Sequence, residues 1–267
     1  VIKQNTENVN LLKTKDYNIF SVLQIQSKEV LICRMIADLL NPRGQHGAGA
    51  EYLKIFLRDC LGMEKMDTKL ADQAIVTAEY AIDDERRIDI VIEMGSYFLP
   101  IEVKIYAADQ KSQCFDYYQY AKRRDAQAKV YYLTLDGHRP GKDSTSSGSQ
   151  SVPEEDIVCL SFREHILNWL KACKNCGNTG MIPILEQFIR NIEQISGYTS
   201  ERVRNMVIDE LLTSGDSLRA GMQIADSINA AKAKLIYQVM EEFEKQLAGV
   251  AEKNHWTREK NSNWYEY

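Results

Sequence analysis

Residues 86–104 read RRIDIVIEMGSYFLPIEVK, and this stretch decides the fold. Two runs rich in Ile and Val, at 86–93 and 97–105, flank the turn-like Met94-Gly95-Ser96, which predicts two adjacent antiparallel strands. Strands this apolar are normally interior, and interior strands carry charge only where it is paired or bound to a metal. The charged residues inside these strands therefore indicate where function is expected.

Alternation along a strand predicts which side chains share a face. In the first strand Asp89 projects from the face opposite to its isoleucines, which are Ile88, Ile90 and Ile92. In the second strand Glu102 and Lys104 share the face opposite to Ile101, Val103 and Ile105. If the two strands pair as a hairpin, Asp89, Glu102 and Lys104 converge on one patch.

Two carboxylates at one patch form a hard-oxygen site suited to Mg²⁺ or Mn²⁺, which use one or two carboxylates, waters and substrate phosphate. Lys104 could then orient or activate a water and stabilise charge on the phosphate. The alternative is structural: Glu102 pairs with Lys104, or Asp89 with Arg87, on a solvated sheet face. Spacing alone leaves both interpretations open.

Two helices could add residues to this patch. Glu29 lies within the apolar stripe of a helix predicted from Asp16 to Leu40, so its carboxylate faces the core or a site, unless it reaches solvent from the stripe edge. A helix predicted from Gln110 to Arg124 places Gln110, Gln113 and Tyr117 on nearly one face, pointing toward the end of the Glu102 strand. Solvated glutamines and a packed Tyr ring are the alternative there.

The rest of the chain predicts a mixed α/β sheet followed by helices. Strands are expected at 74–82, 128–135 and 157–160, and further helices at 50–61, 162–173, 183–195, 200–212 and 220–247. The Gly-, Ser- and Pro-rich segment 137–155 has almost nothing to bury and predicts a mobile surface loop. We expect a first domain at 1–195 and a helical extension at 196–267, whose aromatic tail could begin a β element.

Composition excludes several classes of protein. The 267 residues carry 33 basic and 38 acidic side chains, a net charge of −5, so no whole-molecule positive field attracts nucleic acid. A locally acidic, metal-binding centre remains compatible with a nucleic-acid enzyme. No apolar run of about 18 residues and no secretory signal pattern occur, so the sequence predicts a cytoplasmic protein with reduced cysteines and no membrane partner. Neither a phosphate-binding P-loop nor a dinucleotide motif is present.

Three weaker features have ordinary structural interpretations. Cys173-x-x-Cys176 could be half of a zinc site, but no second pair accompanies it, so helix-end cysteines are favoured. His46 stands between glycines and either assists a site or structures the loop. The basic run 122–124 could contact a nucleic-acid backbone, although such a run is usually a solvated helix end.

The ordered elements resemble the PD-(D/E)XK nuclease superfamily, in which an acidic helix precedes a β-meander with an Asp, a (D/E)-x-K strand and a helix. The matching residues are Glu29, Asp89 and Glu102-Val103-Lys104. Gln113 to Tyr117 is similar to the Q-x-x-x-Y signature of the branch that includes RecB-like nucleases. The stretches DLLNPRGQHGAGAEYLKIFL, RRIDIVIE, IEVKIYAADQKSQ, YYLTLDG and LSFREHILNWLKAC resemble a bacterial and phage group of the superfamily, over residues 23–195.

The resemblance implies a restriction-endonuclease-like core and a metal-dependent phosphodiesterase. Its expected substrate is DNA, and RNA is the less favoured alternative. Asp89, Glu102, the Val103 carbonyl and Glu29 would hold Mg²⁺, with Mn²⁺ as substitute. Lys104 would position the water, while Gln113 and Tyr117 would steady the site. Glu79 is a weaker candidate than Glu29. The alternative is a catalytically inactive nuclease-fold module that binds nucleic acid or protein, and the C-terminal helices could mediate homo-oligomers or bind a protein partner.

Overall fold

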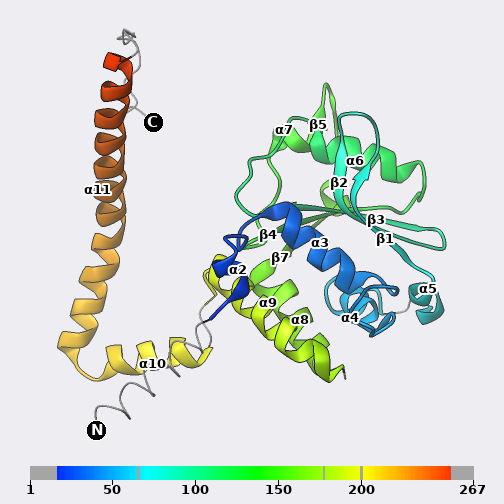
Figure 1. The fold of residues 1–267 in the computed structure, drawn as a ribbon, viewed down its shortest axis with the longest axis horizontal. Coiled ribbons are helices and arrows are strands. Elements are labelled where there is room, and N and C mark those ends of the chain that lie inside the picture. Colours follow the sequence, from blue (N-terminus) through cyan, green and yellow to red (C-terminus); the bar gives the residue numbers. More distant parts are fainter. Residues whose placement is uncertain (1–16, 65–66, 177, 199–200, 254–267) are drawn as a thin grey trace. The chain divides into compact units, whose positions relative to one another are not determined.

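The computed structural model describes residues 17–64, 67–176, 178–198 and 201–253, and it places a five-stranded sheet at the centre of the first unit (Figure 1). The strand order is β1-β2-β3-β4-β7; β1, β2 and β3 are antiparallel, whereas β3, β4 and β7 are parallel. The strands are β1 (Ile75–Ala81), β2 (Arg87–Met94), β3 (Tyr97–Lys104), β4 (Val130–Thr134) and β7 (Ile157–Ser161). The predicted mixed sheet and its meander are confirmed.

Helices cover both faces of this sheet (Figure 1). One face packs against α3 (Glu29–Leu40), α4 (Glu51–Asp59), α8 (Leu167–Lys174) and α9 (Ile182–Ile195). The other face is covered by α6 (Gln113–Lys122), and α7 (Lys142–Thr145) packs against α6. The remaining short elements of the first unit are α2 (Ile19–Val22), α5 (Thr68–Asp72), β5 (Ser146–Ser147), β6 (Gln150–Ser151), η1 (Glu154–Asp156), η2 (Phe162–Ile166) and η3 (Thr179–Met181).

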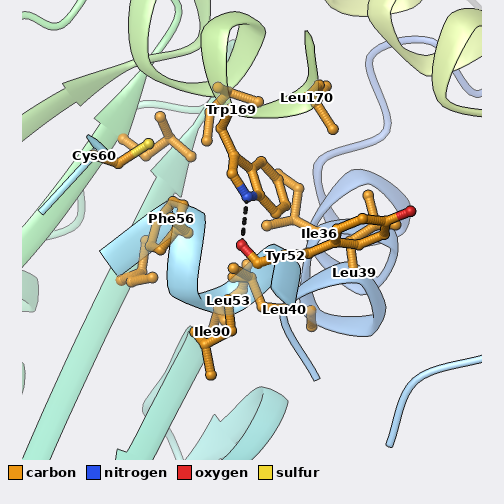
Figure 2. Close-up of a cluster of buried hydrophobic side chains, with 14 of the residues drawn as sticks. Ile36, Leu39, Leu40, Tyr52, Leu53, Phe56, Cys60, Ile90, Trp169 and Leu170 are labelled. Carbon is orange, nitrogen blue, oxygen red and sulfur yellow. Dashed lines mark hydrogen bonds between the residues drawn. The ribbon is translucent and has the colours of Figure 1, made fainter. Parts of the chain in front are cut away.

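The larger core lies between the sheet, α3, α4 and α8 (Figure 2). Trp169 of α8 is fully buried, and its indole Nε1 donates a hydrogen bond of 2.8 Å to the carbonyl oxygen of Tyr52 in α4. Phe56 meets the Trp169 ring edge-on, with centroids 5.4 Å apart. A buried indole is satisfied only when its N–H finds an acceptor, so this bond fixes α8 against α4.

The helix predicted from Asp16 to Leu40 is instead two helices, α2 and α3, in the described part of that range. Gln24 adopts a left-handed φ of 54°, which an α-helix cannot contain. The chain turns there, with the Ile25 N–H donating to the Phe20 carbonyl at 2.9 Å. Glu29 therefore starts α3 instead of lying in mid-helix, and this places its carboxylate at the helix N-terminus.

An irregularity in the β1–β2 hairpin changes the face of the sheet on which Ile88 lies. Ile90 and Ile92 pack in the larger core as expected, but Ile88 packs with Val91 in the core on the α6 side. Across the hairpin, Glu79 has a φ of 54°, between the paired positions Ala78↔Ile90 and Tyr80↔Ile88. A left-handed residue interrupts the regular pleat, so the predicted common face for Ile88, Ile90 and Ile92 is wrong at Ile88.

The Gly- and Ser-rich segment 137–155 contains α7, the small β5–β6 hairpin and part of η1. The segment was expected to have almost nothing to bury, and two of its residues, Ser144 and Val152, are buried. The Ser144 hydroxyl accepts the Cys114 N–H at 3.3 Å, which joins the segment to α6. Mobility of this segment stays a prediction.

The chain divides after Tyr198 into two compact units. The second unit contains α10 (Glu201–Leu212) and α11 (Gly215–Lys253), which is longer than the helix predicted at 220–247. The aromatic tail lies outside the described residues. Within the described ranges, no helix is both long and apolar enough to span a membrane.

Candidate metal-dependent nuclease site

Asp89 meets the β3 strand at the place where the β2–β3 ladder ends. The last paired residues are Ile90↔Ile101, and one step further the Asp89 Oδ2 accepts the Val103 N–H at 2.8 Å. The Asp89 carboxylate therefore accepts the Val103 N–H in place of the backbone carbonyl of a paired strand residue. The predicted convergence of Asp89 with the strand that carries Glu102 and Lys104 is therefore present in the structure.

Glu102 and Lys104 form a buried ion pair on the α6 side of the sheet. Lys104 Nζ lies 2.5 Å from Glu102 Oε1, and the two side chains are 8% and 1% exposed. The second oxygen, Glu102 Oε2, is buried and accepts no N–H or O–H from the described residues; the Glu102 and Asp89 side chains share a hydrogen bond only when one of the two carboxyls is protonated. The alternative of a salt bridge on a solvated face does not fit, because these charges are buried and no ion pair joins Asp89 to Arg87 within the described chain.

The pKa values in this group are shifted because the group is buried and because one ammonium, that of Lys104, faces two carboxylates, those of Glu102 and Asp89. Burial, and then the neighbouring Asp89 charge, raise the pKa of Glu102 well above its ordinary 4.5. Burial also raises the pKa of Asp89, although the Val103 N–H opposes this change. Burial alone would lower the pKa of Lys104, but Glu102 reverses the direction and raises it. Lys104 thus stays charged, and one lysine cannot balance two carboxylates.

Glu29 approaches from the opposite helix layer. Its Oε2 accepts the Ile105 N–H at 2.8 Å, one residue beyond the end of β3. The carboxylate is partly buried, and its charge contributes to the raised pKa values of Asp89 and of the buried Cys33 thiol. The structure brings Glu29 to the site as predicted, but through its place at the start of α3 instead of through the apolar stripe.

Gln113 and Tyr117 lie together on α6, whereas Gln110 precedes the helix. Gln113 Nε2 donates to the Tyr117 hydroxyl at 3.1 Å, and that hydroxyl donates to the Arg87 carbonyl at 2.5 Å. Both side chains are buried, and burial followed by the Glu102 charge raises the pKa of Tyr117. This chain of hydrogen bonds fixes α6 to β2 two residues before Asp89.

Arg86 is a positioning residue that sequence reasoning missed. Its guanidinium donates to Gln110 Oε1 at 2.9 Å and to the Lys111 carbonyl at 2.6 Å, and it lies 3.1 Å from Asp116 Oδ2. These contacts hold the start of α6 against the β1–β2 turn. The only sequence signal is the pair of arginines before Ile88, which does not distinguish the anchored Arg86 from the exposed Arg87.

Other candidates have structural partners. Glu79 pairs with Arg34 at 2.6 Å. His46 is buried and structures its loop, because its Nε2 lies 2.9 Å from the Asn41 carbonyl and its Nδ1 accepts the Ala48 N–H at 3.1 Å. In the basic run, Lys122 pairs with Asp156 at 3.2 Å and Arg124 with Glu93 at 2.9 Å, whereas no ion pair is formed by Arg123 within the described ranges.

The acidic side chains of the site match what a divalent ion requires. Among the described residues, no three His, Cys, Asp or Glu side chains form a group that could hold a metal. Mg²⁺ needs only one or two carboxylates, because it retains several waters. Asp89 and Glu102 meet this requirement, and the buried Oε2 without a hydrogen bond is an oxygen that a cation would satisfy. The residues therefore fit Mg²⁺ or Mn²⁺.

Comparison with known families agrees with this geometry. The model of the PD-(D/E)XK nuclease superfamily matches residues 17–191, and the chain belongs to this superfamily. The five-stranded mixed sheet with flanking helices is the restriction-endonuclease-like α/β fold expected of it. No curated protein and no solved structure shows significant similarity to the chain. Membership indicates a metal-dependent nuclease, while the branch with the Q-x-x-x-Y signature stays a prediction.

Proposed function

We propose that this protein is a Mg²⁺-dependent nuclease that hydrolyses phosphodiester bonds and that it acts in the cytoplasm. DNA is the favoured substrate and RNA the alternative. The observation that carries the proposal is the buried Glu102–Lys104 pair beside Asp89, with one Glu102 oxygen left without a hydrogen bond. Burying two acids and one base costs stability, so such a group is expected where it serves a site. Superfamily membership supports the same reaction.

Asp89, Glu102 and the Val103 carbonyl are the proposed metal ligands, and Glu29 joins them directly or through water. The bound ion would neutralise phosphate charge and lower the pKa of a coordinated water. Mn²⁺ is the expected substitute, because it also prefers carboxylate and water oxygens. The requirement for a cation follows from the charge of the group, because Lys104 balances only one of the two strand carboxylates.

Lys104 is proposed to position the attacking water and to stabilise negative charge on the phosphate. Its ion pair with Glu102 holds the ammonium at a fixed place, and its raised pKa keeps it cationic at neutral pH. Gln113 and Tyr117 are proposed to steady the site through the hydrogen bonds that join α6 to β2. Positioning of this kind removes orientational freedom from the reacting groups.

The test is cleavage of labelled single- and double-stranded DNA, and of RNA, with Mg²⁺, Mn²⁺ or EDTA. The wild type is compared with Asp89→Asn, Lys104→Met and the control Glu79→Gln, which changes a carboxylate of β1 that pairs with Arg34 of α3. We expect metal-dependent cutting that is lost in the first two variants and retained in the control. Thermal unfolding of each variant separates loss of chemistry from loss of fold.

Two outcomes would change the proposal. Cleavage that persists in EDTA, or in Lys104→Met at the wild-type rate, contradicts the assigned site. If all three substrates stay intact while binding of DNA or RNA is retained, the alternative of an inactive nuclease-fold binding module replaces the proposal.

A further inference from the structure

Large apolar side chains lie exposed along α11. Ile224, Leu235, Val239 and Phe243 are 65%, 61%, 59% and 54% exposed. Monomeric proteins rarely leave a contiguous apolar surface of this length open to water, and such surfaces usually bind another protein. The occupant can be inferred from the spacing and charge of the helix.

Eight apolar residues of α11 form a stripe, which we call the seam; other exposed apolar residues of the helix, such as Met222 and Ile236, lie outside it. Its members are Ile224, Ile228, Ala231, Leu235, Val239, Phe243, Leu247 and Val250. Successive members are three or four residues apart, and seven steps cover 26 residues, about 3.7 residues per step. This is close to the 3.6 residues per turn of a straight α-helix. The seam therefore stays near one side of α11 and suits packing against another long helix.

The seam is symmetrical about its middle. Residues 224 and 250, 228 and 247, 231 and 243, and 235 and 239 each have their midpoint at 237 or 237.5. A second copy of α11 that runs antiparallel through this point therefore brings a seam residue level with every seam residue. Ala231, the smallest, comes level with Phe243, the largest, whereas a parallel copy would place Phe243 level with Phe243.

The charges on α11 favour the same orientation. Lys232 and Lys234 precede the midpoint, and Glu241 and Glu242 follow it. In the antiparallel alignment, position 234 comes level with 241 and position 232 with 242, so opposite charges share a level. A parallel alignment would bring like charges level, which disfavours it.

The first half of the seam also contains a hollow. It is lined by the small side chains of Ala220, Ser227 and Ala231 and by the larger ones of Gln223, Ile224 and Ile228. The antiparallel alignment brings Phe243 and Leu247 of the second copy to this half of the helix. In coiled helices, large side chains of one helix likewise enter holes between the side chains of the facing helix.

We propose that α11 binds a second copy of itself in antiparallel orientation along the seam, so that the protein is a homodimer. The seam lies entirely within the second unit, so the proposed dimer does not depend on the proposed nuclease site.

The first experiment measures the mass of the full chain in solution by sedimentation equilibrium between about 1 and 100 µM. We expect a dimer whose dissociation constant rises about a hundredfold in Ala231→Glu, because each copy then places a carboxylate in an apolar contact. Ala233→Glu is the matched control, since it makes the same substitution about 200° around the helix. Circular dichroism checks that both variants keep their helix. A monomeric wild type, or equal weakening in both variants, overturns the proposal.

The second experiment tests orientation by disulfide cross-linking in a Cys176→Ser background, which removes the exposed cysteine. Ile224→Cys and Val250→Cys are prepared separately and then mixed under oxidation. The antiparallel pair predicts cross-linked dimers in the mixture and few in either variant alone. Efficient cross-linking of Ile224→Cys alone would overturn the antiparallel arrangement.

Discussion

The sheet site and α11 depart from the usual distribution of side chains in opposite ways. At the site, charged Glu102 and Lys104 are buried, whereas on α11 apolar residues such as Leu235 and Phe243 are exposed. Buried charge and exposed apolar surface are the two informative departures in a globular protein, because each costs stability unless a partner compensates. The two departures support the two proposals, that the site binds a cation and that α11 binds a second copy of itself.

The largest expected effect is on catalysis. Lys104→Met keeps the aliphatic stem but removes the ammonium, and we expect cleavage to fall by about 10³-fold or more, as when an electrostatic stabiliser is removed. Association through α11 should not change, because that helix belongs to the other unit. Cleavage rates and sedimentation of the same preparation measure both. A variant that loses dimerisation together with cleavage would remove the distinction between the two regions.

A second prediction concerns the core that supports the site. Trp169→Phe removes the N–H that satisfies the Tyr52 carbonyl and leaves a space beside Phe56. The free energy of unfolding should fall by about 1–3 kcal/mol, because a buried hydrogen bond is lost and the smaller ring leaves a cavity. Urea unfolding measures this change. Cleavage at a temperature well below the transition should stay near the wild-type rate, since Trp169 does not contact the site residues.

A third prediction concerns pH. The pKa values of Glu102 and Asp89 are raised in the folded protein, so the folded state keeps protons that the unfolded state releases above the ordinary values of 4.5 and 3.8. The contribution of these two carboxylates to stability without metal is therefore greatest below these values and is lost as pH rises through the raised ones. Each unit of pKa difference corresponds to about 1.4 kcal/mol.

Thermal unfolding in EDTA across pH measures this dependence. Glu102→Gln should flatten the decline, and Mg²⁺ should stabilise the wild type most at high pH, where both carboxylates are ionised. A stability that rises with pH from 4.5 to 7 in EDTA, and is unaffected by Glu102→Gln, contradicts the assignment of these shifts.

The smallest expected effect is at Glu79. Glycine relieves its left-handed φ of 54° but removes the exposed pair with Arg34. The first change is worth about 1 kcal/mol and the second up to about 1 kcal/mol in the opposite direction. Glu79→Gly should therefore stay within about 1 kcal/mol of the wild type and keep full cleavage. A large loss of activity at unchanged stability would place Glu79 in the site.

The sequence predicts the site well where strand alternation is regular. Glu102 and Lys104 share a face, as their spacing in β3 requires, and the turn Met94-Gly95-Ser96 sets the hairpin that brings Asp89 to them. The predictions of the first helix and of the face of Ile88 fail because a residue other than glycine adopts a left-handed backbone conformation nearby. Gln24 divides the first helix, and Glu79 moves Ile88 to the other core. Neither residue is a glycine, so no local signal marks the change.

The contacts of Arg86 and the buried Ser144 depend on segments far apart in the chain. A pattern confined to one element cannot identify which of two arginines reaches the start of α6, or that a Ser-rich loop receives a backbone N–H from that helix. These features arise from tertiary packing. They explain why the predicted set Asp89, Glu102 and Lys104 is found together while Arg86, which also holds α6 beside them, was missed.

The central claim is that Asp89 and Glu102 hold a divalent cation, and calorimetric titration with Mn²⁺ tests it most directly. The account predicts that the wild type and Glu79→Gln bind Mn²⁺ with similar affinity and that Asp89→Asn does not bind it detectably. Binding that is unchanged in Asp89→Asn, or absent from a folded wild type, would contradict the account.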